Sequence, residues 1–274
     1  MAVDQRFDRR PAPRRPLVVI PALNEERALP AVLRELAEPR PHIDILVIDD
    51  GSHDRTTAAA RACGVRVVRL PFNLGVGGAM RTGYRYALRN GYDAVVQVDA
   101  DGQHDTAYID RLLAGLGKAD IVIGARFAGM GDYPAGRGPR RWAMRLLAVV
   151  LSRLAKTRLT DTTSGFRAAG RRAMTLFAHH YPAEYLGDTV ESLVIALRSG
   201  CTVRQEPVAM RPRLAGQASQ TPLRSTVYLL RAVVALGLAL LRRWTPLPVP
   251  VETGAEMGVV APVAPDEDRK ARAG

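Results

Sequence analysis

The sequence contains few aromatic residues, only two cysteines and no apolar run long enough to cross a membrane. Phe, Trp and Tyr make up 5% of its 274 residues and are not interleaved with basic residues, so a base-stacking surface for nucleic acid is disfavoured. Cys63 and Cys201 are far apart and fit no metal-binding spacing, which favours reduced thiols in a cytosolic protein. Near the amino terminus the sequence has no apolar segment of the kind that would predict a secretory signal.

Acidic residues are also in short supply. The chain has 27 Asp and Glu against 39 Lys and Arg, and its net charge of +12 comes almost wholly from arginine. Such a balance indicates an anionic partner, and phosphate-bearing substrates or an acidic membrane surface are favoured over nucleic acid. The length suffices for one large α/β domain or two small ones with a proper core.

Two polar segments flank the central part of the chain. Residues 1–16 are rich in Arg and Pro, and residues 245–274 are rich in Pro, Val, Ala and charged residues. Neither composition can bury enough apolar surface to fold, so we expect a disordered arm and a disordered tail. A single catalytic domain is expected between them, over residues 17–220.

An apolar segment precedes the tail. Residues 227–241 are apolar except for Arg231, and Arg-Arg-Trp follows them. This run is shorter than the roughly twenty residues that span a bilayer, and an arginine at its centre would be costly there. We therefore expect residues 221–244 to form a helix that lies in the membrane interface, or else packs on the catalytic domain or on a partner.

Strand and helix patterns alternate along the central part. Short apolar runs predict strands at 17–20, 43–48, 65–70, 95–98, 120–124 and 202–210. The stretches between them predict helices at about 25–38, 54–62, 106–116 and 189–198, with another ending near residue 90. Pro21 is expected to stop the first strand. Asn24 is the expected cap of the first helix, and Ser52 or Asp54 that of the second. The alternation predicts parallel βαβ units whose loops gather at one edge of a sheet.

Two carboxylates follow the fourth strand. Asp99 and Asp101 are two residues apart, so in an extended segment they point to the same side, where they can hold one hard divalent cation. A calcium loop is disfavoured because Gly102 is the fourth residue of the motif rather than the sixth, and a strand rather than a helix precedes it. An ordinary solvated Asp-Gly turn is the alternative.

The other loops also carry groups suited to a nucleotide. The loop after the first strand brings backbone groups and Glu25 to the edge of the sheet, and the second strand ends in Asp49 and Asp50. Helix capping is the alternative role for these residues, and it is favoured less for the two Asp residues than for Glu25. The glycine-rich residues 73–78 allow close backbone approach to a phosphate, with Arg81 as a counter-charge. This run is not a dinucleotide fingerprint, because its last glycine is replaced and it lies in the third βα unit, so a dehydrogenase is disfavoured.

The ordered set of motifs resembles family 2 glycosyltransferases, most closely the branch of dolichyl-phosphate mannosyltransferase and polyprenyl-phosphate glucosyltransferases. The matching segments read VVIPALNEE (18–26), IDDGS with Asp54 (48–54), NLG with GA (73–79), DADGQH (99–104), GARF (124–127) and DTTSGFR (161–167). The resemblance covers roughly residues 17–244. It implies a GT-A fold, which is α/β and Rossmann-like with a mostly parallel central sheet flanked by helices, here followed by a C-terminal apolar or amphipathic helix. It also implies a nucleotide-sugar donor, a divalent metal and inversion at the anomeric carbon.

Together, the loops and the resemblance assign three groups of site residues. The nucleotide-sugar site would comprise Pro21, Ala22, Asn24, Glu25, Asp49, Asp50, Gly75, Gly78, Arg81, Asp99 and Ala100. Mg²⁺ or Mn²⁺ would be held by Asp99, Asp101 and Gln103, with His104 as a hydrogen bonder to the ligands rather than a ligand. The acceptor phosphate would be bound by Arg126, Arg141, Ser164 and Arg167. The residues assigned to catalysis are Asp99, Asp101, Arg126, Asp161 and Arg167.

Arginines dominate the acceptor side of this assignment. A lipid phosphate is already anionic at neutral pH, so guanidinium groups that place it matter more than a general base. Arg141 has close alternatives in Arg137, Arg140 and Arg145, and Asp161 could orient an arginine or serve as a base. The branch usually has a Pro-Glu-rich stretch where this chain has residues 186–191. A sugar-hydroxyl acceptor would require a base, and Asp188 is the residue we would assign to that role.

The resemblance therefore predicts an inverting, metal-dependent enzyme that moves a hexose from a nucleotide sugar of the GDP-mannose or UDP-glucose type to a polyprenyl phosphate. A family 2 enzyme that acts on a glycan or small-molecule hydroxyl is one alternative. A partner-binding module on a degenerate GT-A fold is another. The expected location is the cytoplasm, peripherally on the inner leaflet of the cell membrane, with a membrane protein or a second copy as further partners.

Overall fold

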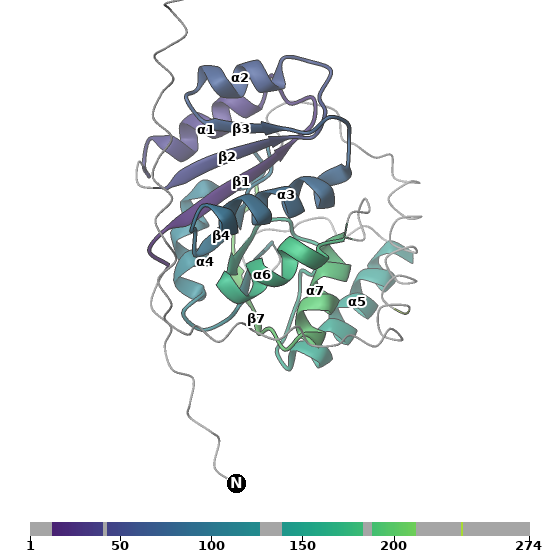
Figure 1. Ribbon diagram of the computed structural model, residues 1–274. Helices are drawn as coiled ribbons and strands as arrows, with labels where there is room; N and C mark the ends of the chain where they lie inside the picture. Colours follow the sequence, from purple (N-terminus) through teal and green to yellow (C-terminus); the bar gives the residue numbers. More distant parts are fainter. Residues whose placement is uncertain (1–12, 41–42, 127–138, 183–187, 212–236, 238–274) are drawn as a thin grey trace, which may run out of the picture.

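One mixed sheet organises the part of the chain that the structure describes. The computed structural model describes residues 13–40, 43–126, 139–182, 188–211 and 237. Within these residues the sheet has seven strands in the order β3-β2-β1-β4-β6-β5-β7 (Figure 1). The strands are β1 (Pro16–Ala22), β2 (Asp44–Asp49), β3 (Arg66–Arg69), β4 (Ala94–Gln97), β5 (Ile121–Ala125), β6 (Arg167–Gly170) and β7 (Val203–Pro207).

Helices cover both faces of this sheet. They are α1 (Leu29–Ala37), α2 (Thr56–Ala62), α3 (Gly75–Arg89), α4 (Ile109–Gly115), α5 (Pro139–Ala155), α6 (Arg171–His180) and α7 (Asp188–Arg198), with a 3₁₀ turn at Thr106–Tyr108. Alternate residues of β1 enter the two cores. Leu17 and Val19 pack with α3, α5, α6 and α7, whereas Val18 and Ile20 pack with α1, α2 and α4. This alternation follows from the two-residue period of a strand.

The sheet is parallel except at one strand. β6 lies antiparallel between β4 and β5, and the other neighbouring pairs are parallel. The carboxyl ends of β1, β2, β4 and β5 therefore meet at one edge, and β6 begins at that same edge. The predicted fold class, α/β with a mostly parallel sheet flanked by helices, is confirmed.

Several predicted boundaries are wrong in instructive ways. Pro21 does not stop β1, which pairs with β2 as far as Ala22. Beyond Val19 no β4 residue pairs with β1, so a missing backbone N–H is tolerated there. Asn24 does not cap α1, which begins at Leu29, because Asn24 has a left-handed backbone with φ 56° and bonds to the next loop instead.

The second helix also starts later than predicted. α2 begins at Thr56, and the preceding residue Arg55, at the capping position, provides no side-chain cap. The Ser52 hydroxyl accepts from the Asn24 N–H, while Asp54 accepts from the N–H and the hydroxyl of Thr56. The sequence predicts no element between residues 125 and 188, where the structure has α5, β6 and α6.

Some predictions fall outside the described residues. They are the disordered arm over residues 1–12, the side chain of Arg141, the helix at 221–244 apart from residue 237, and the tail at 245–274. Within the described part of the chain, no helix combines the length and the apolar character needed to cross a membrane.

Gly83 offers a test of how closely α3 packs on the sheet. A Cβ atom there would lie 2.6 Å from Cγ1 of Val19 on β1. Helix propensity alone predicts that Gly83→Ala stabilises the protein by about 1 kcal/mol, whereas overpacking costs about 1–3 kcal/mol. We expect the steric cost to be larger, because neither the α3 backbone nor the buried Val19 side chain can shift without disturbing its own packing. The free energy of unfolding should therefore fall. Urea denaturation measures it, with Arg85→Ala on the exposed face of α3 as the control. A more stable Gly83→Ala variant would contradict the close packing.

Candidate functional site

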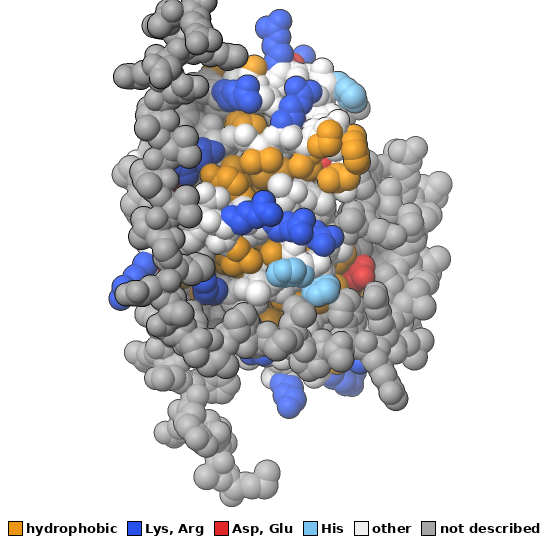
Figure 2. All heavy atoms as spheres, viewed as in Figure 1, with side chains coloured by type: hydrophobic (Ala, Val, Ile, Leu, Met, Phe, Trp, Pro, Cys, Tyr) orange, Lys and Arg blue, Asp and Glu red, His pale blue; other side chains and the backbone are white. Residues whose placement is uncertain are grey.

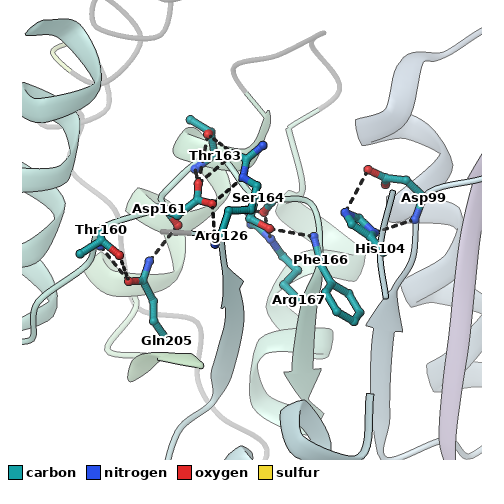
Figure 3. Close-up of polar contacts among 10 residues, drawn as sticks. All are labelled: Asp99, His104, Arg126, Thr160, Asp161, Thr163, Ser164, Phe166, Arg167 and Gln205. Atoms are coloured by element: carbon teal, nitrogen blue, oxygen red, sulfur yellow. Dashed lines mark hydrogen bonds and ion pairs between the residues drawn. The ribbon is translucent and has the colours of Figure 1, made fainter. Parts of the chain in front are cut away.

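Asp99 and Asp101 lie at the carboxyl edge of the sheet, just beyond the end of β4 (Figure 3 shows Asp99). The Asp99 side chain is 40% exposed, whereas Asp101 is buried, with 8% of its surface exposed. One Asp101 carboxylate oxygen accepts the Gln103 N–H at 3.0 Å, which closes a tight turn. Asp99 is thus the carboxylate of this pair that faces solvent.

His104 contacts both the backbone N–H and the carboxylate of Asp99. Its Nδ1 accepts the Asp99 backbone N–H at 3.0 Å, so Nε2 carries the ring proton and lies 3.5 Å from Asp99 Oδ2. The His104 ring is 4% exposed and stacks on Phe166 with 4.8 Å between ring centroids. These contacts make His104 a hydrogen-bonding neighbour of Asp99, and the role of Asp99 as a metal ligand stays a prediction.

Two further residues set the position of the Asp99 carboxylate, and the sequence did not reveal them. Gln97 is 2% exposed, and its Nε2 lies 3.3 Å from Asp99 Oδ1. Gly165 faces the same carboxylate, because a Cβ atom there would lie 3.3 Å from each Asp99 oxygen and 3.1 Å from Gln97 Nε2. A polar residue inside an apolar strand, two positions before Asp99, was the available signal for Gln97.

The loops after β1 and β2 are joined by reciprocal hydrogen bonds. The N–H of Asn24 donates to Ser52 Oγ at 2.9 Å, and Asn24 Oδ1 accepts the His53 N–H at 2.9 Å. The N–H of Glu25 donates to Thr56 Oγ1 at 2.9 Å. These loops therefore form one rigid wall, with Asn24 as a link rather than a helix cap.

Asp49 and Asp50 are both nearly inaccessible, at 1% and 3% exposure. Burial acts to raise the pKa of Asp49, but hydrogen bonds from Ser52 and Thr57 outweigh it and leave the pKa below its ordinary value. Burial raises the pKa of Asp50, although the Leu74 N–H donates to its Oδ1 at 2.7 Å. Both carboxylates thus brace loops of the site, and their contact with a nucleotide stays a prediction.

The glycine-rich turn begins α3 at the same edge. Gly75 has φ +79°, and its N–H donates to Asn73 Oδ1 at 2.8 Å. A Cβ atom at Gly78 would lie 2.5 Å from Leu74 Cβ, so the turn requires glycine there.

Arg81 donates from Nε to the Ala178 carbonyl of α6 at 3.5 Å. Ala22, which is also predicted to bind the nucleotide, lies at this edge as well, since its carbonyl accepts the Asp50 N–H at 2.9 Å.

Arg126 follows β5 and is held by Asp161 (Figure 3). Its Nε donates to Asp161 Oδ2 at 2.6 Å, and its Nη2 donates to Asp161 Oδ1 at 2.9 Å and to Thr163 Oγ1 at 2.9 Å. Asp161 is fully buried, whereas 20% of the Arg126 side chain is exposed. The paired guanidinium is therefore fixed in place at the surface of the site.

Two roles are predicted for Asp161, namely to orient an arginine or to serve as a base. Burial acts to raise the pKa of Asp161, but the hydrogen bonds and charge of Arg126 outweigh it and hold that pKa below its ordinary value. A carboxylate of lowered pKa that is already bonded through both oxygens is a poor proton acceptor. Gln205 of β7 secures the loop from behind, since its Nε2 donates to the Asp161 carbonyl at 2.8 Å and its Oε1 accepts the Thr160 N–H at 2.7 Å. The geometry favours Asp161 as the residue that orients Arg126.

Arg167 does not face the site. It is 0% exposed, and its guanidinium donates to the Ser164 carbonyl at 2.7 Å and 3.2 Å and to Ser192 Oγ on α7 at 3.1 Å. A fully buried guanidinium cannot touch an incoming phosphate in this conformation. We therefore replace the predicted acceptor contact of Arg167 with a positioning role, which ties the Ser164 loop to α7. Ser164 itself is buried, at 2% exposure, and its Oγ accepts the Phe166 N–H at 3.3 Å.

Arg211 connects the acidic turn to α1. Its N–H donates to the Gln103 carbonyl at 3.0 Å, and its guanidinium bonds Glu35 at 2.8 Å and Asp105 at 2.7 Å. This network holds the backbone of the turn, while the predicted role of the Gln103 side chain stays a prediction. Sequence patterns do not predict these contacts, because Arg211 lies 176 residues from Glu35 and 106 residues from Asp105.

The residues around Asp99 suit a magnesium or manganese ion, although no cluster of three or more His, Cys, Asp or Glu with metal-binding geometry occurs among the described residues. Mg²⁺ usually takes one or two protein carboxylates and completes its shell with water and substrate phosphates. Asp99 and Asp101 supply such a pair, and Asp99 is open to solvent. The donor set therefore fits a cation shared with a phosphate ligand.

Comparison with known proteins agrees with this geometry. The family model described as "Glycosyl transferase family 2" matches residues 17–177. The undecaprenyl-phosphate mannosyltransferase of Micrococcus luteus is 35% identical over 218 residues, which cover 76% of this chain and 88% of that protein. The polyprenol monophosphomannose synthase of Mycolicibacterium smegmatis is 35% identical over 58% of this chain and 63% of that protein.

Solved structures share the fold at lower identity. The glucosyl-3-phosphoglycerate synthase of Mycobacterium tuberculosis, in complex with Mn²⁺, UDP-glucose and phosphoglyceric acid, has a TM-score of 0.61 at 22% identity. The alignment covers 82% of this chain and 79% of that one. The same enzyme with Mg²⁺ and UDP has a TM-score of 0.62 at 23% identity, over 82% and 79% of the two chains.

Gly165→Ala tests whether the position of the Asp99 carboxylate sets cation affinity. The added Cβ would force Asp99 or Gln97 to move by a few tenths of an ångström, so we expect Mn²⁺ to bind about tenfold more weakly in the presence of UDP or GDP. Isothermal titration calorimetry measures the affinity. Gly170→Ala is the matched control, because its Cβ would meet its nearest atom at an ordinary 3.6 Å. Equal affinity in both variants would rule out the proposed constraint on Asp99.

Asp161→Asn tests the buried ion pair through its pH dependence. Because the pKa of Asp161 is lowered below 3.8, its contribution is complete above that value and is lost as the pH falls through the lowered pKa. We expect the variant to be about 3 kcal/mol less stable than the original at neutral pH, with the difference shrinking below pH 3.8. Urea unfolding at several pH values measures this. Glu206→Gln, which breaks the more exposed pair with Arg111, should cost under about 1 kcal/mol. A pH-independent difference for Asp161→Asn would show that the charge of Asp161 is not the stabilising feature.

Proposed function

The chain belongs to glycosyl transferase family 2 and is therefore a glycosyltransferase, and we propose that its acceptor is a polyprenyl phosphate. Two relatives at 35% identity support this acceptor, since their names specify undecaprenyl-phosphate mannosyltransferase and polyprenol monophosphomannose synthase. The donor we propose is a nucleoside-diphosphate hexose of the GDP-mannose or UDP-glucose type.

The observation that carries this proposal is the Arg126–Asp161 pair. The Asp161 carboxylate beside the reaction edge is committed to Arg126 through both oxygens, and the pKa of Asp161 is lowered, so it does not serve as a base. A hydroxyl acceptor needs a base, whereas a phosphate is already ionised at neutral pH. Arg126 then provides a fixed positive charge that holds the acceptor phosphate in line with the anomeric carbon.

In the proposed reaction, an acceptor phosphate oxygen forms a bond to the anomeric carbon while the bond from that carbon to the nucleoside diphosphate breaks, which inverts the configuration. Asp99, Asp101 and Gln103 would hold Mg²⁺ or Mn²⁺, which would stabilise the negative charge of the departing diphosphate. His104 and Gln97 contact the Asp99 carboxylate and would keep it oriented towards that ion. The rigid wall formed by the loops after β1 and β2 would bind the nucleoside.

A lipid acceptor also indicates where the enzyme would work. We propose that the enzyme works peripherally at the cytoplasmic face of the cell membrane, where the phosphate group of a polyprenyl lipid is accessible from water. Nucleotide sugars are water-soluble, so the donor would reach the site from the cytoplasm rather than from the membrane.

Transfer of labelled sugar tests the acceptor class. Purified full-length protein, incubated with Mg²⁺ or Mn²⁺, a panel of labelled nucleotide sugars and polyprenyl phosphate, should yield a product that partitions into organic solvent and is labile to mild acid. A water-soluble, acid-stable product formed from a glycan or small-molecule hydroxyl would refute the phosphate acceptor. In that case Asp188, whose side chain lies outside the described residues, becomes the residue to substitute.

Variants of Arg126 and Asp101 separate acceptor binding from donor binding. Arg126→Lys keeps the charge but loses the paired geometry, so we expect transfer to fall about 100-fold while the KM for the donor stays within about twofold. Asp101→Ala should abolish transfer with any acceptor because a proposed metal ligand is lost. Arg89→Lys, an exposed position on α3, is the matched control and should be fully active. Full activity of Asp101→Ala would refute the metal assignment.

A further inference from the structure

Large exposed hydrophobic side chains are concentrated in two short segments of the described chain. The first includes Phe72, Leu74 and Val76, which are 62%, 39% and 38% exposed. The second, on α5, includes Leu146, Val149 and Leu154, which are 36%, 45% and 37% exposed. No large hydrophobic residue elsewhere in the described part of the chain is comparably exposed. Such clustering marks an interaction surface, because single exposed apolar residues are ordinarily scattered.

Both segments are anchored to the folded domain. The Leu74 N–H donates to the buried Asp50 carboxylate at 2.7 Å, and a Cβ atom at Gly51 would lie 2.8 Å from the Phe72 carbonyl carbon. On α5, Leu147 and Leu151 are fully buried against the core. The fold therefore holds the apolar side chains of both segments outward rather than leaving them on a frayed end.

The sequence around both segments lacks negative charge. No Asp or Glu occurs in residues 55–92 or in residues 133–160, although each range contains several arginines. Arg85 and Arg89 on α3 and Arg145 and Arg153 on α5 are exposed. Figure 2 shows hydrophobic side chains beside a band of Lys and Arg side chains on the face that carries α3. An apolar surface built from segments that carry cations and no carboxylate complements an anionic lipid surface.

The two segments also lie on one side of the molecule. In Figure 1 the start of α3 and the whole of α5 are on the right of the view, towards which the strand β1 points. This is the side of the carboxyl edge, where Asp99 and Arg126 lie. A lipid surface that touched both segments would face the edge of the sheet that carries the site.

We propose that residues 72–76 and the exposed face of α5 form one lipid-docking surface, which binds the headgroup and upper acyl region of an anionic bilayer. The proposal deepens the proposed function and rests on it, since a polyprenyl phosphate embedded in that bilayer would then meet Arg126 without leaving the membrane. It adds contacts within the catalytic domain to those expected from the helix at residues 221–244. The two rival occupants are the apolar segment 227–241 of the same chain and a second copy of the protein.

Vesicle sedimentation of the full-length protein tests the surface without any substrate. Wild-type protein should sediment with vesicles that contain phosphatidylglycerol, more weakly with pure phosphatidylcholine, and more weakly at high salt. The double variants Phe72→Ser/Val76→Ser and Val149→Ser/Leu154→Ser should each weaken binding about tenfold, because each removes apolar side chains from the lipid. The matched controls Phe72→Leu and Val149→Leu retain an apolar side chain and should bind as the wild type does.

The possible outcomes separate this proposal from its rivals. Unchanged vesicle binding in both double variants, or weakening in only one of them, would overturn the single shared surface. Lower thermal stability in the absence of lipid, with vesicle binding unchanged, would assign the patch to the segment 227–241. A shift from dimer to monomer in sizing by light scattering, again with vesicle binding unchanged, would assign it to a second copy.

Vesicle binding and sugar transfer are measured independently, so the two proposals can fail separately. If the double variants lose vesicle binding and no transfer to polyprenyl phosphate is found, the docking surface stands and the acceptor is wrong. If transfer is found and the double variants bind vesicles normally, the acceptor stands and the docking surface is wrong.

Discussion

The antiparallel insertion of β6 between β4 and β5 is the constraint on which the site depends. Its backbone pairing sets Gln97 opposite Arg167 on one side and Ile123 opposite Arg167 on the other. The loop that precedes β6 must therefore cross the carboxyl edge of the sheet. That crossing places Gly165 against the Asp99 carboxylate and Asp161 against Arg126. A parallel strand at this position would bring a different end of the chain to the site, and neither contact would form.

Burial divides the carboxylates of the site into two kinds. Asp49, Asp50 and Asp161 are almost completely buried, and each accepts a hydrogen bond from a loop residue. Asp99 is 40% exposed, yet Gln97, His104 and Gly165 surround its carboxylate on the protein side. Asp49, Asp50 and Asp161 build a rigid frame, and Asp99 is open to a cation beside the buried Asp101. This separation permits a highly charged site, because the cost of burying a carboxylate is met by hydrogen bonds that also hold the loops.

Sequence patterns predict that the candidate site loops lie at one edge of the sheet, but they do not predict the contacts inside those loops. The α/β class, the acidic pair after β4 and the family followed from local runs and from the order of motifs. The local sequence predicts Asn24 as a helix cap, but its partner, His53, lies in another loop. The motif that contains Arg167 predicts an acceptor contact, but the structure buries this side chain completely. The sequence patterns predict none of α5, β6 and α6, and β6 is only four residues long, which leaves little local signal.

The sequence by itself determined which residues gather at one edge of the sheet, because alternating apolar runs and helices force successive loops to that edge. It also determined the net positive charge and the absence of carboxylates from two long stretches. Only the tertiary structure decided which carboxylate is open and which arginine is exposed. Solvent access and hydrogen-bond partners depend on contacts between residues far apart in the chain, such as Arg126 with Asp161 and Asp161 with Gln205. No local pattern encodes those distances.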